Sequence, residues 1–186
     1  MLVATMAACA SDDPPNSSGS NTSTASLPKI SDTIDAEWGD LAECATGPAG
    51  QEADVKSSPA TEGVADVESF GKLAQDHVDG CVDSPVRPAV GGPHHSPWAN
   101  CGLYTSPIPE EAAVHDLEHG AVWISFSPDA SDATLELVRS KVEASTHVVA
   151  SPYPGLAADE IILSAWSRQL SLDSVDTTAI ESFLST

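Results

Sequence analysis

Histidine is the residue type with the most chemical potential in this 186-residue chain, and five of its six histidines fall between His77 and His119. His115 and His119 lie four residues apart, so on a helix both rings project from one face and can bind the same ion. Imidazole is a ligand for zinc, copper, nickel and iron. The spacing predicts a metal site; the alternative is a pair of interior histidines that donate hydrogen bonds to backbone.

Further ligands are expected from the segment that precedes this helix. His94 is preferred to its neighbour His95 because it directly follows the Gly91-Gly92-Pro93 turn. His77 is a weaker candidate, since a histidine at a helix end can simply complement the helix dipole. His147 lies apart, in a predicted strand, where we expect a structural or exposed side chain. The predicted metal ligands are therefore His115, His119, His94 and His77.

Copper and zinc are the metals that this composition favours. The only methionines, Met1 and Met6, stand in an N-terminal apolar stretch, so the thioether ligands that favour Cu(I) are missing from the rest of the chain. We expect Cu(II) or zinc, with copper ahead of zinc. Because no complete catalytic set accompanies the histidines, the first hypothesis is a metal-binding protein that serves metal handling, without a catalytic residue.

Two other functions stay open. Glu118 lies inside the string His115-Asp116-Leu117-Glu118-His119, which has the H-x-x-E-H pattern of inverted zinc peptidases. In a zinc hydrolase Glu118 would be the general base that activates a metal-bound water. In the third reading the protein is a non-catalytic interaction module whose histidines only organise a loop.

The elements that must position these residues are a loop, helices and a small sheet. Pro and Gly dominate residues 81–109 and predict a long irregular loop. Val64 to Leu73 has apolar residues at three-residue spacing and is expected to form a short helix. Behind the loop, the pattern predicts helices at 109–119, 132–144 and 176–184 and strands at 121–126, 146–150 and 160–166. We therefore expect an α+β domain: a small mixed sheet with helices packed on it and a Pro/Gly-rich loop in the front half.

Charge and the N-terminus bear on the environment of the protein. A formal net charge of −21 repels phosphate backbones and anionic headgroups, so nucleic acid is a poor partner. Met6-Ala7-Ala8-Cys9 resembles the lipobox of bacterial lipoproteins, which predicts a partial signal peptide at 1–8 and a lipid on Cys9. The polar run at 11–26 is typical of a flexible tether.

The expected organisation follows: a lipidated cysteine with a Ser/Thr/Pro-rich tether at 9–60 and one histidine-rich domain at 61–186. The protein would be exported and anchored on the outer face of the cytoplasmic membrane, touching the membrane through its lipid alone; no protein partner is specified. In that oxidising compartment two of Cys44, Cys81 and Cys101 can form a disulfide. We favour Cys81 with Cys101, because both flank the Pro/Gly-rich segment.

Several motifs together resemble one bacterial family. They are Pro88-Ala89-Val90-Gly91-Gly92-Pro93-His94, Trp98-Ala99-Asn100-Cys101-Gly102-Leu103-Tyr104 and the run from Glu111 to Trp123, followed by Ser151-Pro152-Tyr153-Pro154-Gly155-Leu156 and Ala165-Trp166. The combination resembles domain-of-unknown-function family 3105 in its actinobacterial lipoprotein form, over about Gly63 to Phe183. The resemblance implies a site containing His77, His94, Trp98, Tyr104, His115, Glu118 and His119, lowers the rank of His95 and Cys101 as ligands, and implies no particular activity.

Overall fold

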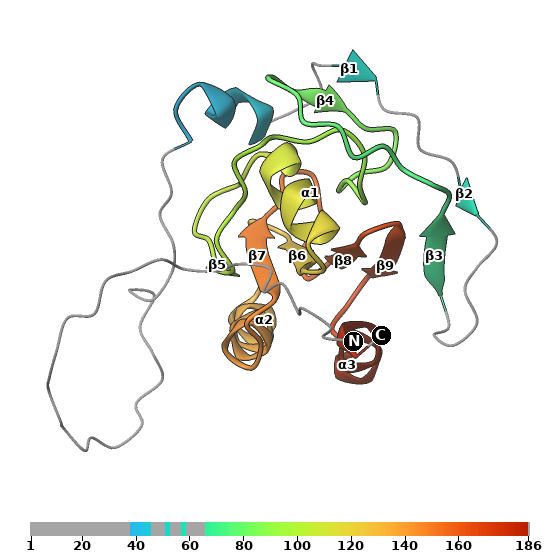
Figure 1. Cartoon of the computed structure of the whole chain (residues 1–186). Coiled ribbons are helices and arrows are strands. Elements are labelled where there is room, and N and C mark those ends of the chain that lie inside the picture. Colours follow the sequence, from blue (N-terminus) through green and yellow to red (C-terminus); the bar gives the residue numbers. More distant parts are fainter. Residues whose placement is uncertain (1–37, 46–50, 53–56, 59–65, 186) are drawn as a thin grey trace, which may run out of the picture.

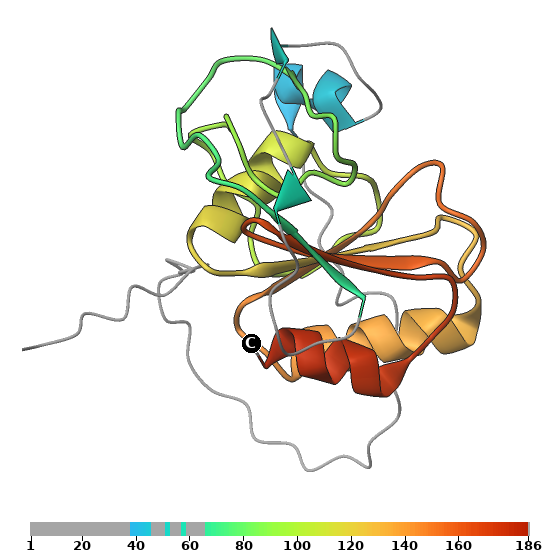
Figure 2. The same cartoon turned by 90° about the vertical axis from the view of Figure 1, so that its right-hand side faces the viewer.

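A central sheet separates two helical layers. The computed structural model describes residues 38–45, 51–52, 57–58 and 66–185. Figure 2 shows the sheet edge-on, with α2 (Asp132–Glu143) and α3 (Thr177–Leu184) on one face and α1 (Glu110–Glu118) on the other. The predicted signal peptide, the predicted lipidation site Cys9 and the run at 11–26 lie outside the described residues. Among the described residues, no helix is long and apolar enough to cross a membrane.

The sheet is mixed, which confirms the predicted α+β class. Its seven strands follow in the order β2 (Ser57–Ser58), β3 (Val67–Phe70), β9 (Arg168–Leu172), β8 (Ile161–Ala165), β6 (Val122–Phe126), β7 (Val148–Pro152) and β5 (Gly102–Leu103). Neighbours are antiparallel except for the parallel pairs β6 with β7 and β7 with β5. A separate parallel pair joins β1 (Gln51–Glu52) to β4 (Val82–Asp83).

Alternation along the strands supplies a core to each face of the sheet. On β6, Ile124 and Phe126 point toward α2 and α3, where Phe183 closes the larger core. Trp123, the residue directly before Ile124, points the other way and packs under Leu117 of α1. One strand of alternating buried residues thus holds helices on both faces.

The predicted helix boundaries are confirmed by their caps. Pro109 precedes α1, as expected for a residue with no N–H to leave unpaired, and Gly120 ends that helix region with a φ of 91°. The Ser131 hydroxyl accepts a hydrogen bond from the Thr134 backbone N–H at the start of α2, and Asp176 does the same for α3.

The predicted helix at 64–73 is wrong, because the described part of this segment contains strand β3. Val67 and Phe70, three residues apart, lie on opposite faces of a strand, and each is buried in a different core. Over so few residues this spacing fits a doubly buried strand as well as a helix. Pairing with β9, a strand absent from the prediction, decides between them.

The predicted Cys81–Cys101 disulfide is also wrong: Cys81 is bonded to Cys44, with Cα atoms 5.1 Å apart. Residues 81–109 do not close on themselves: they contain β4 and β5, spread across α1 and end where α1 begins. Cys44 is buried in η2 (Gly39–Ala45), a 3-10 helix that contacts α1. Ordered structure joined to the domain is therefore present ahead of residue 61, where we expected the domain to begin.

Candidate metal centre

Buried acids at the start of α1 hold the Pro/Gly-rich loop in place. The Glu110 carboxylate pairs with Arg87 and accepts hydrogen bonds from the Ala89 N–H (2.8 Å) and the Tyr153 hydroxyl (2.8 Å). The Glu111 carboxylate accepts a hydrogen bond from the Val82 N–H. All of these partners are distant from the two glutamates in sequence, by more than 20 residues. The start of α1 therefore holds segments that precede it and follow it in the chain.

The Tyr153 contact gives a direct test of this layer. Burial raises the pKa of both tyrosines in the chain, Tyr104 and Tyr153, so the folded protein retains both phenol protons where an exposed tyrosine, with a pKa of about 10, is half ionised. We expect no tyrosinate absorbance at 295 nm near pH 10 until the protein unfolds. Since the folded pKa values exceed the unfolded ones, stability is retained below pH 10 and falls as the pH rises further. Ordinary titration of either tyrosine in the folded protein would contradict this packing.

Side chains in the last turns of α1 also form hydrogen bonds to the backbone of the Pro/Gly-rich loop. The His115 Nδ1 atom is 2.7 Å from the His95 carbonyl oxygen, and the Asp116 carboxylate accepts a hydrogen bond from the Ala99 N–H. Burial raises the pKa of Asp116 to about 8. The segment 95–99 is thus fixed to the same turn of helix that carries His115.

A backbone bridge brings His77 beside His94. The two residues form an isolated parallel β-bridge, in which the Val78 N–H donates to the His94 carbonyl (2.8 Å) and the His94 N–H donates to the Asp76 carbonyl (3.0 Å). The bridge fixes the separation of these two side chains independently of the residues between them in sequence.

Three imidazole rings and one carboxylate converge as a result. The ring centroids of His77, His94 and His115 are 5.0 Å apart in every pair. Glu118 joins them, with its Oε2 atom 3.1 Å from His94 Nε2, and one ligand atom of each of the four residues lies within 4.8 Å of the others. We call these four residues the His3Glu cluster.

Hydrogen bonds to backbone carbonyls fix the orientation of two of the rings. His94 Nδ1 is 2.9 Å from the Gly92 carbonyl oxygen and His115 Nδ1 is 2.7 Å from that of His95, so each ring donates its proton through Nδ1 and presents the lone pair of Nε2 to its neighbours, Glu118 for His94 and His119 for His115. Backbone carbonyls play this role for many metal-bound histidines. His94 Nε2 is buried without a hydrogen bond to any described residue, and burial lowers the pKa of His115, which favours the neutral form that binds metals.

His119 lies beside the His3Glu cluster but is not one of its four residues. It is exposed, and its Nε2 atom lies 3.0 Å from Nε2 of His115, with the two rings stacked. Three of the four predicted ligands therefore meet, Glu118 takes the fourth place, and His119 lies at the rim. The prediction considered Glu118 as a base and, through the family resemblance, as a site residue, but not as a metal ligand, although its position three residues after His115 puts both on one helix face.

The residues around the His3Glu cluster differ in how they contact it. His95 is buried, with its Nε2 atom 3.0 Å from the Gly80 carbonyl oxygen, which agrees with its low rank as a ligand. Trp98 is half exposed and lies edge-on to His115, as a wall of the site would. Tyr104 instead packs on Trp38, away from these rings. Trp166, named from the sequence as part of a family motif but not as a site residue, lies edge-on to His94, with the ring centroids 6.2 Å apart.

Gly91 lets the loop that carries His94 pass under Trp166. A Cβ atom there would lie 2.6 Å from Cδ1 of Leu73 and 3.1 Å from the Trp166 ring, at a φ of 137°. We expect Gly91→Ala to cost about 1–3 kcal/mol of unfolding free energy and to weaken metal binding, because the loop must shift. Gly155→Ala is the matched control: its φ is also positive, but nothing lies within 4 Å. Chemical denaturation and metal titration of both variants check this, and equal effects would contradict it.

These observations define an α+β domain with three histidines and one glutamate converging on a common point. The chain belongs to the family described as "Protein of unknown function (DUF3105)", whose model matches residues 77–186. The matched region begins at His77 and contains the whole His3Glu cluster, so the resemblance to this family is confirmed. No curated protein and no solved structure matches the chain.

Proposed function

We propose that this protein binds one divalent transition-metal ion in the His3Glu cluster and serves in metal handling. The observation that carries the proposal is the equal 5.0 Å spacing of the three imidazole rings around a fourth, anionic ligand. Ligand atoms that bind one tetrahedral ion at about 2.0–2.1 Å are about 3.3 Å apart, and the 3.1 Å between His94 Nε2 and Glu118 Oε2 is close to that value.

Copper and zinc stay the two candidate metals, and different arguments support them. Cu(II) binds nitrogen and oxygen ligands more tightly than zinc does, which favours copper when both ions are present. Three equally spaced rings suit the tetrahedral geometry of zinc better than the square-planar or tetragonal geometry of Cu(II). A sulfur ligand is not offered by the cluster, and no cysteine among the described residues is a free thiol.

The decisive experiment is metal analysis of the purified chain after loading with Zn²⁺, with Cu²⁺ and with an equimolar mixture. We expect one equivalent of metal in each single-metal sample, and the mixture reports the preference directly. X-ray absorption at the metal edge should show nitrogen and oxygen neighbours only. Less than one tenth of an equivalent after loading with either ion would remove the proposal.

Glu118 is proposed as a ligand and not as a general base. A base must leave room for a water between itself and the ion, whereas Glu118 lies at ligand-to-ligand distance from His94. Glu118→Gln is expected to lower metal affinity by about tenfold or more, as a lost ligand should cost at least what a lost outer contact does. Calorimetric titration measures this, with exposed Glu136→Gln as control. Unchanged affinity would instead favour the zinc-hydrolase alternative.

We further propose that the protein is exported and lipid-anchored through Cys9. The Cys44–Cys81 disulfide supports an oxidising compartment, because such bonds persist mainly outside the cytosol. Incorporation of a labelled fatty acid in the bacterial host tests the anchor, and a Cys9→Ser variant that still incorporates the label would contradict it.

A further inference from the structure

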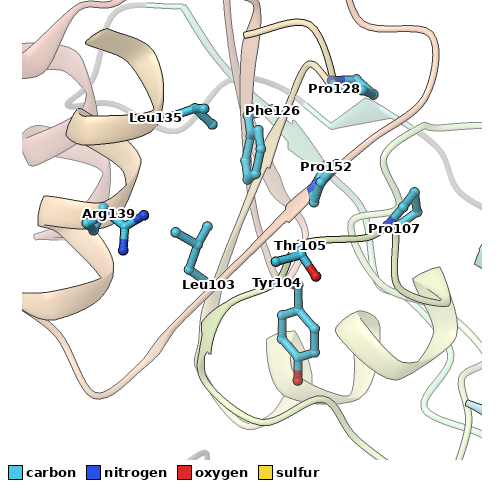
Figure 3. Close-up of a pocket in the computed structure, with 9 residues that line it drawn as sticks. All are labelled: Leu103, Tyr104, Thr105, Pro107, Phe126, Pro128, Leu135, Arg139 and Pro152. Carbon is cyan, nitrogen blue, oxygen red and sulfur yellow. The ribbon is translucent and has the colours of Figure 1, made fainter. Parts of the chain in front are cut away.

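A second candidate site is a pocket of about 450 Å³ on a different part of the domain from the His3Glu cluster. Figure 3 shows Leu135 and Arg139 of α2 on one side and Pro107, in the loop that follows β5, on the other, with Phe126 and Pro152 between them. Its walls are mostly apolar: Leu103, Tyr104, Pro107, Phe126, Pro128, Leu135 and Pro152, with Thr105 and Arg139 completing the lining. The volume is that of a small-molecule site, for which about 300–1,000 Å³ is usual.

The pocket lies where the topology of the sheet opens a crevice. Leu103, Phe126 and Pro152 are the last residues of β5, β6 and β7, the three parallel strands. The connection after β5 leads to α1 on one face of the sheet, and the connection after β6 leads to α2 on the other face (Figure 2). Because β7 lies between β5 and β6 in the sheet, the two connections diverge on either side of its C-terminal end. In open sheets with parallel strands, ligands bind outside the carboxyl ends of the strands at such a divergence.

Arg139 supplies the one charge of the lining. It is half-buried on α2, and no described residue forms an ion pair with it. Acidic groups outnumber basic groups four to one in this chain, with 28 Asp and Glu against seven Lys and Arg. A guanidinium without an acidic partner beside an apolar hollow offers two parallel N–H donors to a carboxylate.

We propose that this pocket binds a small carboxylic acid with an apolar body, the carboxylate on Arg139 and the apolar body against Leu103, Phe126 and Leu135. The inference is independent of the proposed metal site, because no residue of the His3Glu cluster lines the pocket. Burial of the apolar body provides affinity, and the guanidinium selects acids from neutral molecules of the same shape.

The test uses octanoate as the probe and octan-1-ol as its uncharged counterpart, titrated into the full chain by calorimetry and by NMR. Octanoate is expected to bind and to shift resonances of the pocket residues. Arg139→Gln should weaken octanoate binding roughly tenfold or more and leave octanol binding unchanged, because only the acid loses a charged hydrogen bond. Lys72→Gln, which removes an exposed cation elsewhere, is the matched control and should bind octanoate as the wild type does.

A second variant, Leu135→Trp, tests the apolar part of the pocket and leaves the charge of Arg139 unchanged. Leu135 is half-buried at the pocket wall, so a larger side chain should fill the hollow and block both probes while thermal stability is retained. Failure of the full chain to bind octanoate would overturn the proposal. Equal octanoate affinity in the wild type and in Arg139→Gln would overturn it too, as would resonance shifts confined to other parts of the domain.

Discussion

Replacing His94 with alanine is expected to lower metal affinity at least about 100-fold, the largest effect of any single change in the chain. His94 is fully buried at the centre of the cluster, with its Nδ1 atom held by the Gly92 carbonyl and its Nε2 atom beside Glu118. Removing a held ligand should cost more than the 10–100-fold typical of an outer contact. Calorimetry and competition with a chelator of known affinity measure the change.

Two other histidines provide matched controls. His147 is exposed, its ring is hydrogen-bonded to the neighbouring Thr146 hydroxyl and it is not part of the His3Glu cluster, so His147→Ala should bind metal as the wild type does. His95→Ala should lower the stability of the metal-free protein, because the ring is buried, and should affect metal binding less than His94→Ala. Equal affinity in His94→Ala and His147→Ala would contradict the proposed site.

The second large effect is expected from the Cys44–Cys81 disulfide. The bond closes a loop of 37 residues in sequence, for which the chain-entropy relation gives about 4 kcal/mol at 25 °C. The double variant Cys44→Ala, Cys81→Ala should lose about 2–4 kcal/mol of unfolding free energy, with a fall in Tm of roughly 10 °C. Thermal and denaturant unfolding, each followed by circular dichroism, measure both quantities.

Reduction provides the control for this variant. The wild type treated with a thiol reductant should lose at least as much stability as the double variant does, because reduction also opens the disulfide of Cys101. Metal affinity should change only modestly, because neither cysteine belongs to the His3Glu cluster. Equal stability of the oxidised and reduced wild type would show that the bond does not constrain the fold.

Local signals in the sequence were sufficient for the second half of the fold. Helix caps such as Ser131 and Asp176, the stop at Gly120 and the alternation along Val122–Phe126 all act within a few residues, and the elements that they predict are confirmed. Strand β3 and the Cys44–Cys81 bond were missed, because partners distant in sequence determine them: β9 for the strand, and the path of the loop over α1 for the disulfide.

The candidate site could be predicted in part for the same reason. His115 and Glu118 share a helix face through their spacing, so a local rule places them together. His77 comes close to His94 through a backbone bridge. The Pro/Gly-rich loop is held against α1 by the buried carboxylates of Glu110 and Glu111. In the sequence, the positions of these two acids near a helix start suggest only an interaction with the helix dipole. Long-range hydrogen bonds of this kind leave no periodic trace in a sequence.

Two tryptophan rings beside the imidazoles should make the intrinsic fluorescence of the protein sensitive to the bound metal. The centroid of the Trp98 ring lies 5.5 Å from that of His115 and the centroid of the Trp166 ring lies 6.2 Å from that of His94, so each indole lies against a proposed ligand of the ion. A paramagnetic ion held by those ligands quenches indole emission, whereas zinc, with a filled d shell, does not quench in this way. Intrinsic fluorescence can therefore follow the exchange of one metal for the other in real time, without a label and without separating bound from free protein.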